Sequence, residues 1–351
     1  MKPSFLKQPA LLAALLLIPA FSCLAQSGVK TKSMKKEFVV GQDVRLNIET
    51  SFGKVHCNVW DKNQMTIDVL VTADARSDKD AQRLLDQITP EITGNSSLVE
   101  IKTIIGNTGS NGKSKSFSID YTINMPRSTT LTAENRFGDL FIDESTGPVK
   151  IDIEYGNLTI NRLSNPSSSI TLKFSNGTIH NAGDVNFNLQ YSTLNNNTAS
   201  DIRSKTRFST LDLGSLSSAV LDSEYDTYTV EKIREINGSG KFSSLKIDRL
   251  EQKIDMNVEY GGLEIKSVSP SFSIINIIAS FNGISLEIPS DASYRLNADM
   301  SFGECRIPKG SAVTVTEKSH TSRSIIGIVG SSKNPAAKVN IKGRNADIDL
   351  Y

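Results

Sequence analysis

The segment IDIEYGNLTI, Ile151–Ile160, decides the fold because its pattern returns along much of the chain. Related segments read ITLKFSNGTI at 170–179, FNLQYSTLNN at 187–196 and NGSGKFSSLKI at 237–247. When the copies are aligned on their aromatic residue, they follow one another every 17 to 21 residues. A period this steady over ten copies is typical of a solenoid. The ten aromatic residues are Phe137, Tyr155, Phe174, Tyr191, Phe208, Tyr225, Phe242, Tyr260, Phe281 and Phe302.

Apolar residues alternate on both sides of each aromatic residue. Ile151 and Ile153 precede Tyr155 at even spacing, and Leu158 and Ile160 follow it at odd spacing. Such alternation predicts strands with one face toward a core, and the change of spacing predicts a tight corner at the small residue after the aromatic. By parity, we expect the aromatic rings inside the core rather than on a sugar-stacking surface. The tyrosines concerned are Tyr155, Tyr191, Tyr225 and Tyr260.

One repeat, at about 3.3 Å per residue, is long enough to close one small turn, or rung, of a parallel β-helix. The residue before each aromatic is basic in one copy and acidic or amide in the next. Rungs stack about 4.8 Å apart, so one repeat per rung places opposite charges side by side, whereas two repeats per rung would stack like charges. The pattern therefore favours one repeat per rung. The residues are Arg136, Glu154, Lys173, Gln190, Arg207, Glu224, Lys241 and Glu259.

The repeats, at 131–308, are flanked by segments of different character. Residues 26–130 are predicted to form an N-terminal cap of β-strands with one helix at 77–88, because an exposed first rung would invite edge pairing. Ser77 is the candidate N-cap of that helix, and Asp80 completes a capping-box-like pair. Within the cap, SFGKVHCNV resembles a divergent repeat with Val55 and Cys57 at core positions. Residues 309–351 are predicted closing strands.

The first 25 residues are predicted to be a secretory signal peptide. Lys2 and Lys7 precede the apolar run Leu11–Ile18, and cleavage is expected after Ala25. A lipid anchor at Cys23 is the alternative. No later stretch is apolar for 18 residues or more, so the mature chain has no predicted membrane span. The protein is expected to be exported, to the periplasm, the outer membrane surface or the extracellular space.

The composition of the chain offers no strong electrostatic signal. Hydrophobic residues make up 38% of the 351 positions, and without Lys2 and Lys7 the 39 basic residues become 37 against 38 acidic ones. This near balance argues against a nucleic-acid partner. The mature cysteines are Cys57 and Cys305, which we expect to be free and buried, with a bridge between them as the alternative.

The sequence contains no recognisable catalytic set. His56, His180 and His320 lie far apart and are expected on the surface. No metal-binding, phosphate-binding or nucleophile motif is present. The ladder carboxylates, such as Glu154 and Glu224, are separated by basic or amide neighbours, which favours ion pairs over acid–base chemistry. We therefore expect no catalytic residue, no cofactor and no metal.

Together these segments resemble the DUF4097 family of exported bacterial proteins, a Bacteroidetes-type group labelled adhesin-like. The resemblance rests on SFGKVHCNVWDKNQMTIDV, the helix at 77–88, YTINMP before the repeats, and the copies FGDLFI, YGNLTI and YGGLEI. It implies an all-β, single-stranded right-handed parallel β-helix and supplies no catalytic residues.

The expected function is that of a non-enzymatic, adhesin-like binding protein whose partner is an unknown envelope protein or a glycan. Stacked rungs suit this role because they give an extended rigid face. The alternatives are a carbohydrate-active β-helix enzyme, either a lyase or a hydrolase, and a periplasmic scaffold or sensor component.

Overall fold

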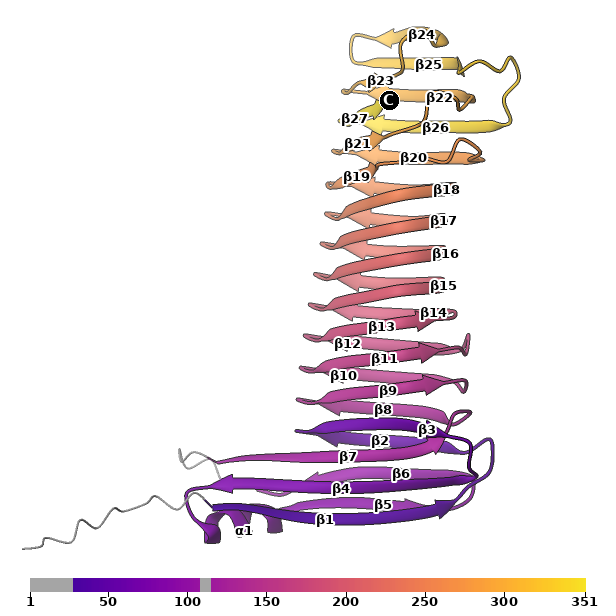
Figure 1. Ribbon diagram of the computed structural model, residues 1–351. Coiled ribbons are helices and arrows are strands. Elements are labelled where there is room, and N and C mark those ends of the chain that lie inside the picture. The colour runs from indigo at the N-terminus through magenta and orange to yellow at the C-terminus, as the bar shows by residue number, and fades with distance from the viewer. Residues whose placement is uncertain (1–27, 108–114) are drawn as a thin grey trace, which may run out of the picture.

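The computed structural model describes residues 28–107 and 115–351. Within these residues the chain is almost entirely β: 27 strands belong to one hydrogen-bonded sheet, and α1 (Asp78–Asp86) is the single helix. The strands form a tall stack with the N-terminal region at one end and the C-terminal region at the other (Figure 1). The predicted signal peptide, with Ala25 and Cys23, lies outside the described residues.

Each repeat forms one rung of the stack, as the charge pattern predicts. β10 (Val149–Glu154) pairs in parallel with the strands one repeat before and one repeat after it, β8 and β12. β11 (Asn157–Leu163), on the other side of the corner, pairs likewise with β9 and β13. The remaining early strands are β8 (Thr130–Arg136), β9 (Asp139–Ser145), β12 (Ser168–Lys173), β13 (Asn176–Ala182) and β14 (Val185–Gln190).

In the middle of the stack a single strand continues through most of a turn. These strands of 15 or 16 residues pair in parallel, and their register aligns equivalent positions of neighbouring repeats, with one irregularity between Ile233 and Glu235 in the β17–β18 pair. They are β15 (Thr193–Arg207), β16 (Thr210–Glu224), β17 (Thr227–Lys241) and β18 (Ser244–Glu259). The next rungs use β19 (Gly262–Ile265), β20 (Ile274–Ser280), β21 (Gly283–Leu286), β22 (Tyr294–Ser301) and β23 (Cys305–Arg306).

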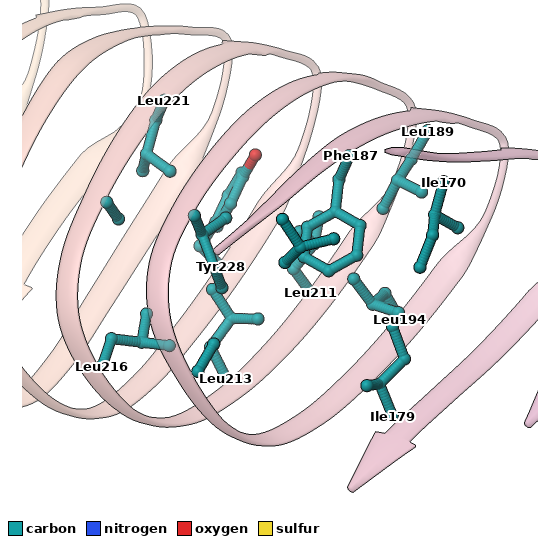
Figure 2. Packing of buried hydrophobic residues seen from close by; sticks show 14 of the residues in the cluster. Ile170, Ile179, Phe187, Leu189, Leu194, Leu211, Leu213, Leu216, Leu221 and Tyr228 are labelled. Atoms are coloured by element: carbon teal, nitrogen blue, oxygen red, sulfur yellow. The ribbon is translucent and has the colours of Figure 1, made fainter. Parts of the chain in front are cut away.

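The apolar positions of the repeat fill the interior. Ile151 and Ile153 are buried on one side of the rung, and Leu158 and Ile160 are buried on the other. In Figure 2 the equivalent side chains, including Leu189 before a corner, point into the centre of the coil. One continuous hydrophobic core therefore runs along the stack, as the period-two pattern predicts.

The corner of each rung differs from the prediction. The aromatic residue itself turns the chain in a left-handed backbone conformation, with φ of 57° at Tyr155 and 51° at Tyr191. The small residue that follows then points inward, and the alternation resumes. Strict alternation would place the ring in the core only if the aromatic were an extended strand residue, as the sequence pattern predicts. That prediction is wrong: the rings of Tyr155, Tyr191, Tyr225 and Tyr260 are 41–51% exposed.

The small residue inside the corner completes the hydrogen bonding between rungs. The hydroxyl of Ser192 accepts a hydrogen bond from the backbone N–H of Ser175 at 3.2 Å, and the hydroxyl of Ser209 accepts one from Ser192 at 3.3 Å. Where Gly156 occupies this position, an added Cβ would lie 1.9 Å from the carbonyl oxygen of Gly138. The corner therefore has two forms, one that accepts serine and one that only glycine can adopt.

The N-terminal cap extends the stack with antiparallel strands. β2 (Arg45–Ser51) and β3 (Lys54–Trp60) form a rung of their own around Phe52, in parallel register with β8 and β9, so the segment SFGKVHCNV is a genuine repeat. The outer cap strands are β1 (Gly28–Val39), β4 (Gln64–Ala75), β5 (Ile88–Gly94), β6 (Leu98–Ile105) and β7 (Ser116–Pro126). Helix α1 has Ser77 as its N-cap, whose hydroxyl accepts from the N–H of Asp80 as predicted.

At the C-terminal end the spatial order of the rungs departs from chain order. β26 (Ala337–Arg344) pairs in parallel with both β20 and β22, so the last residues form a rung between two that precede them in sequence. Asn345 makes the corner of this inserted rung, with φ of 49°, and β27 (Asp347–Leu350) completes it. The hairpin of β24 (Ala312–Ser319) and β25 (Ser322–Val329) then covers β22 in antiparallel fashion.

Gly156→Ala tests the close approach at the corner. Because the new methyl group would overlap a backbone oxygen of the neighbouring rung, we expect a loss of about 2 kcal/mol or more in the free energy of unfolding. Thermal and urea denaturation would measure it. Gly283→Ala is the matched control, since nothing lies within 4 Å of its added Cβ; equal losses in the two variants would contradict the packing argument.

Candidate functional site

The corner residues build a continuous row of stacked rings on the outside of the protein, here called the aromatic ladder. Neighbouring ring centroids lie 4.7–5.1 Å apart, and the ring planes are within 13° of parallel. At about 4.8 Å per rung, the ten rings span about 43 Å. The ladder consists of Phe52, Phe137, Tyr155, Phe174, Tyr191, Phe208, Tyr225, Phe242, Tyr260 and Phe281.

The stacking contacts offset the cost of the corner conformation. A left-handed backbone costs a residue with a side chain about 1–2 kcal/mol relative to the right-handed region. An aromatic pair contributes about 0.5–1.5 kcal/mol beyond the area that it buries. Within the ladder each ring adds about one such contact, so an aromatic residue can occupy a position that would otherwise favour glycine or asparagine.

The same geometry decides which part of each ring meets solvent. Because the ring faces lie against one another, the ladder presents ring edges along its side, together with the hydroxyl group of every second ring from Phe137 to Phe281. The predicted alternation of Phe and Tyr in one stack is therefore confirmed, although the stack lies outside the core. Ring edges carry partial positive charge, so this surface does not offer the exposed faces that cations and sugars stack upon.

Both ends of the ladder are marked by a change of geometry. At the cap end, Phe117 of β7 packs against Phe52 at 5.2 Å, tilted by 56°. At the other end, the inserted rung places Asn345 between the corners of Phe281 and Phe302. Asparagine tolerates the left-handed conformation without a ring, so Phe302 stands apart from the stack and is 63% exposed.

A row of charged residues runs beside the ladder and is largely neutralised. Arg207 and Glu224 approach to 3.0 Å, and Arg136 and Glu154 to 3.3 Å. These pairs confirm the ion pairs predicted between neighbouring rungs. Glu154 was also expected to contact Lys173, but the ammonium group of Lys173 instead lies 3.9 Å from Asp152.

A buried polar cluster lies behind the ladder in the middle of the stack. The carboxylate of Asp226 takes the place of a corner serine and accepts hydrogen bonds from the backbone N–H groups of Ser209, at 2.7 Å, and Glu224, at 2.9 Å. The hydroxyl of Thr206 lies 2.6 Å from both this carboxylate and the phenol of Tyr228. Burial raises the pKa of Tyr228 far above its usual range, so the phenol stays protonated. The cluster is fully paired and faces the interior.

A surface groove follows the first rungs of the ladder, here called the ladder groove. It has a volume of about 540 Å³ and spans the strands β7, β3, β9 and β11. One wall consists of ladder rings with Phe117, and the other consists of polar residues two positions beyond each corner. The floor is glycine backbone. The lining residues are Phe52, Gly53, Lys54, Phe117, Ser118, Asp120, Phe137, Gly138, Asp139, Tyr155, Gly156 and Asn157.

The residues that the sequence singled out for possible chemistry do not converge. His56, His180 and His320 are exposed as predicted and lie on separate strands or turns. Cys57 and Cys305 are both free, Cys57 fully buried and Cys305 partly so. Burial raises the pKa of the Cys57 thiol to about 12 and that of Cys305 to about 11. Neither thiol is therefore a thiolate at neutral pH.

Across residues 28–107 and 115–351, no three His, Cys, Asp or Glu side chains gather in a way that could hold a metal ion. None of the helical structure in these ranges is long and apolar enough to cross a bilayer. Within the part of the chain that is described, the aromatic ladder and its groove are thus the most distinctive surface features.

No family model and no curated protein matches this sequence. Among solved structures, the chain is similar to a "putative cell adhesion protein" from Clostridium sporogenes, at 14% identity, a TM-score of 0.18, and coverage of 91% of this chain and 99% of the other. It is also similar to "putative adhesins" from Parabacteroides merdae, at 12% identity, and Parabacteroides distasonis, at 13%. Both have TM-scores of 0.33, and the matches cover 72% and 73% of this chain and 95% and 97% of the others. Likenesses this weak carry no argument about function.

Tyr191→Gly tests whether stacking holds the ladder together. Glycine relieves the left-handed backbone of its steric cost but removes two ring contacts, so we expect net destabilisation of about 1 kcal/mol. Denaturation curves would measure the change, with Tyr191→Phe as the control that keeps the stack. An unchanged or raised stability for Tyr191→Gly would show that the rings contribute nothing to the rungs.

Glu224→Lys tests the charge row. The substitution places three basic residues on consecutive rungs at 207, 224 and 241, so we expect a loss of up to about 1 kcal/mol at low salt. Because these side chains are exposed, the loss should shrink in 1 M NaCl, measured as melting temperature at both salt concentrations. Glu231→Lys is the control, because this exposed carboxylate has no ion pair among the described residues. An equal, salt-independent loss in both variants would contradict a role for the charge row in stability.

Proposed function

We propose that this protein is an exported, non-enzymatic, adhesin-like binding protein built as a single-stranded right-handed parallel β-helix. The parallel pairing of strands one repeat apart supports the β-helix class, and the strong preference of parallel crossovers for one hand supports a right-handed coil. The segment 1–25 supports export to the periplasm, the outer membrane surface or the extracellular space.

The observation that carries the binding proposal is the aromatic ladder. Ten residues that are 39–51% exposed form one unbroken apolar row, and the stacking that stabilises the corners leaves the ring edges open to a partner. Aromatic residues are enriched where proteins contact partners, and a rigid stack holds them in place before binding. The partner proposed is a glycan or an envelope protein that lies along the ladder and contacts the ring edges and the polar residues beside them, not the ring faces.

The paired charges support a non-enzymatic role over the carbohydrate-active alternative. Hydrolysis of a glycosidic bond by two carboxyl groups requires one of them to stay protonated near neutral pH. The ladder carboxylates Glu154, Glu224 and Glu259 instead lie on separate rungs beside basic partners. Each of these carboxylates therefore faces a cation and not a second carboxyl group, which is the arrangement of an ion pair.

A binding screen with residues 26–351 against glycans and envelope proteins tests the proposal. The double variant Thr227→Arg and Ser244→Arg puts bulky side chains two positions beyond the corners of the ladder without removing a ring. We expect it to weaken binding at least tenfold. Ser215→Arg, at an exposed position elsewhere on the rung, is the control and should bind like the parent.

The screen would also test the enzymatic alternative. Incubation of the same protein with a polysaccharide panel should release no product. Turnover of a polysaccharide that one carboxylate substitution abolishes would refute the non-enzymatic proposal. Equal binding by the parent and all variants would show that the ladder is not the binding surface.

A further inference from the structure

The ladder groove differs from the rest of the ladder in the shape of its floor. At Gly53, Gly138 and Gly156 an added Cβ would lie 1.9–2.0 Å from a carbonyl oxygen of a neighbouring strand. In the next three rungs Ser175, Ser192 and Ser209 occupy the same place with buried side chains, and further along the ladder Gly261 is a single glycine. The three consecutive glycines leave a floor of backbone alone, and the packing around them keeps side chains out of it.

The polar wall of the groove is unusual because its charges are not paired. The strand register places Lys54 between Asp120 on one side and Asp139 on the other. Within the described residues, however, the Lys54 ammonium group forms no ion pair with either carboxylate. This contrasts with the charge row across the ladder, where Arg136 and Glu154 on neighbouring rungs are in contact.

The carboxylates of this wall are held in position by backbone groups. Asp120 accepts a hydrogen bond from the N–H of Lys54 at 3.0 Å, and Asp139 accepts two from Asn157, one from the backbone N–H at 3.1 Å and one from the side-chain amide at 2.8 Å. These bonds use Oδ1 in each case and fix the carboxylates. The second oxygen of Asp139 has no donor within the described residues.

From rung to rung, about 4.8 Å apart, the wall therefore presents an acceptor at Asp120, a donor at Lys54 and an acceptor at Asp139. It ends at the side-chain amide of Asn157, which can both donate and accept a hydrogen bond. A hydroxyl group satisfies each of these sites, because it donates to a carboxylate and accepts from an ammonium group. The two carboxylates disfavour an anionic ligand. The opposite wall disfavours a cationic one, because ring edges are electropositive.

We propose that the ladder groove is a binding site for a neutral, hydroxyl-rich ligand, namely a short oligosaccharide. Its hydroxyl groups bond to Asp120, Lys54 and Asp139, and its C–H surface lies against the ring edges of Phe137 and Tyr155. The volume of about 540 Å³ falls within the range of small-molecule sites. This inference rests on the proposed binding function and assigns it a ligand class and a location.

The test measures the binding of neutral trisaccharides of glucose, mannose and N-acetylglucosamine to residues 26–351 by titration calorimetry. Asp139→Ala, which removes the carboxylate with the free oxygen, is expected to weaken binding at least tenfold, as is Lys54→Ala. Asp212→Ala is the matched control: its carboxylate is exposed, lies on a later rung and has no partner in the described residues, so binding should be unchanged.

Three outcomes would overturn the assignment. They are no binding of any neutral trisaccharide, equal weakening by all three substitutions, or tighter binding of uronic-acid or amino-sugar analogues than of neutral ones. Because Asp139→Ala also removes bonds to Asn157, Asp139→Asn serves as a second variant that keeps an acceptor oxygen, and melting curves confirm that each variant is folded. If the double variant Thr227→Arg and Ser244→Arg loses an envelope partner while Asp139→Ala retains it, the proposed function stands and the sugar site does not.

Discussion

The left-handed corner is the constraint on which the rest of the molecule depends. Each residue of the aromatic ladder donates its N–H to the carbonyl group just before the next corner, as Tyr155 does to Lys173 at 3.1 Å, so hydrogen bonding between rungs continues through the turn. Only a residue with positive φ allows the next side chain to point inward and the core to close. Stacked rings compensate for that backbone, which links the external ladder to the internal core.

The corner also explains why function and stability share the same residues. A ring that stabilises its neighbours by stacking must remain at the surface, because the corner lies on the convex side of the coil. Its edge is then available to a partner without any change in the fold. The groove arises where this arrangement meets the cap, since Phe117 and Asp120 come from β7 and not from the repeats.

Repetition made much of the fold predictable. The spacing of the copies indicated the rungs, the alternation of Arg207 and Glu224 indicated one repeat per rung, and Ser77 with Asp80 marked the start of the helix. The position of the rings was not predictable from parity, because parity assumes an extended backbone at every residue. Aromatic side chains also have no intrinsic preference for positive φ, so no single copy signals the corner.

Other features depend on contacts between distant segments. The groove joins Lys54, Asp120 and Asp139, which are adjacent only after the cap strands have paired. The inserted rung did leave a signal in the sequence. GRNADIDL repeats the apolar spacing of the other copies, with Ile348 and Leu350 three and five residues after Asn345, and asparagine is the ordinary residue for a left-handed corner. Aligning copies on aromatic residues alone hides this rung.

The insertion of β26 has a consequence for how the chain is made. β20 and β22 each pair with it, so the rung around Phe302 has no parallel neighbour to dock on until residues 337–344 have been made. A product cut short before residue 337 would keep two open strand edges, which recruit other chains and expose the chain to proteolysis. The gap between β20 and β22 is therefore closed only when the segment 337–350 has docked between them.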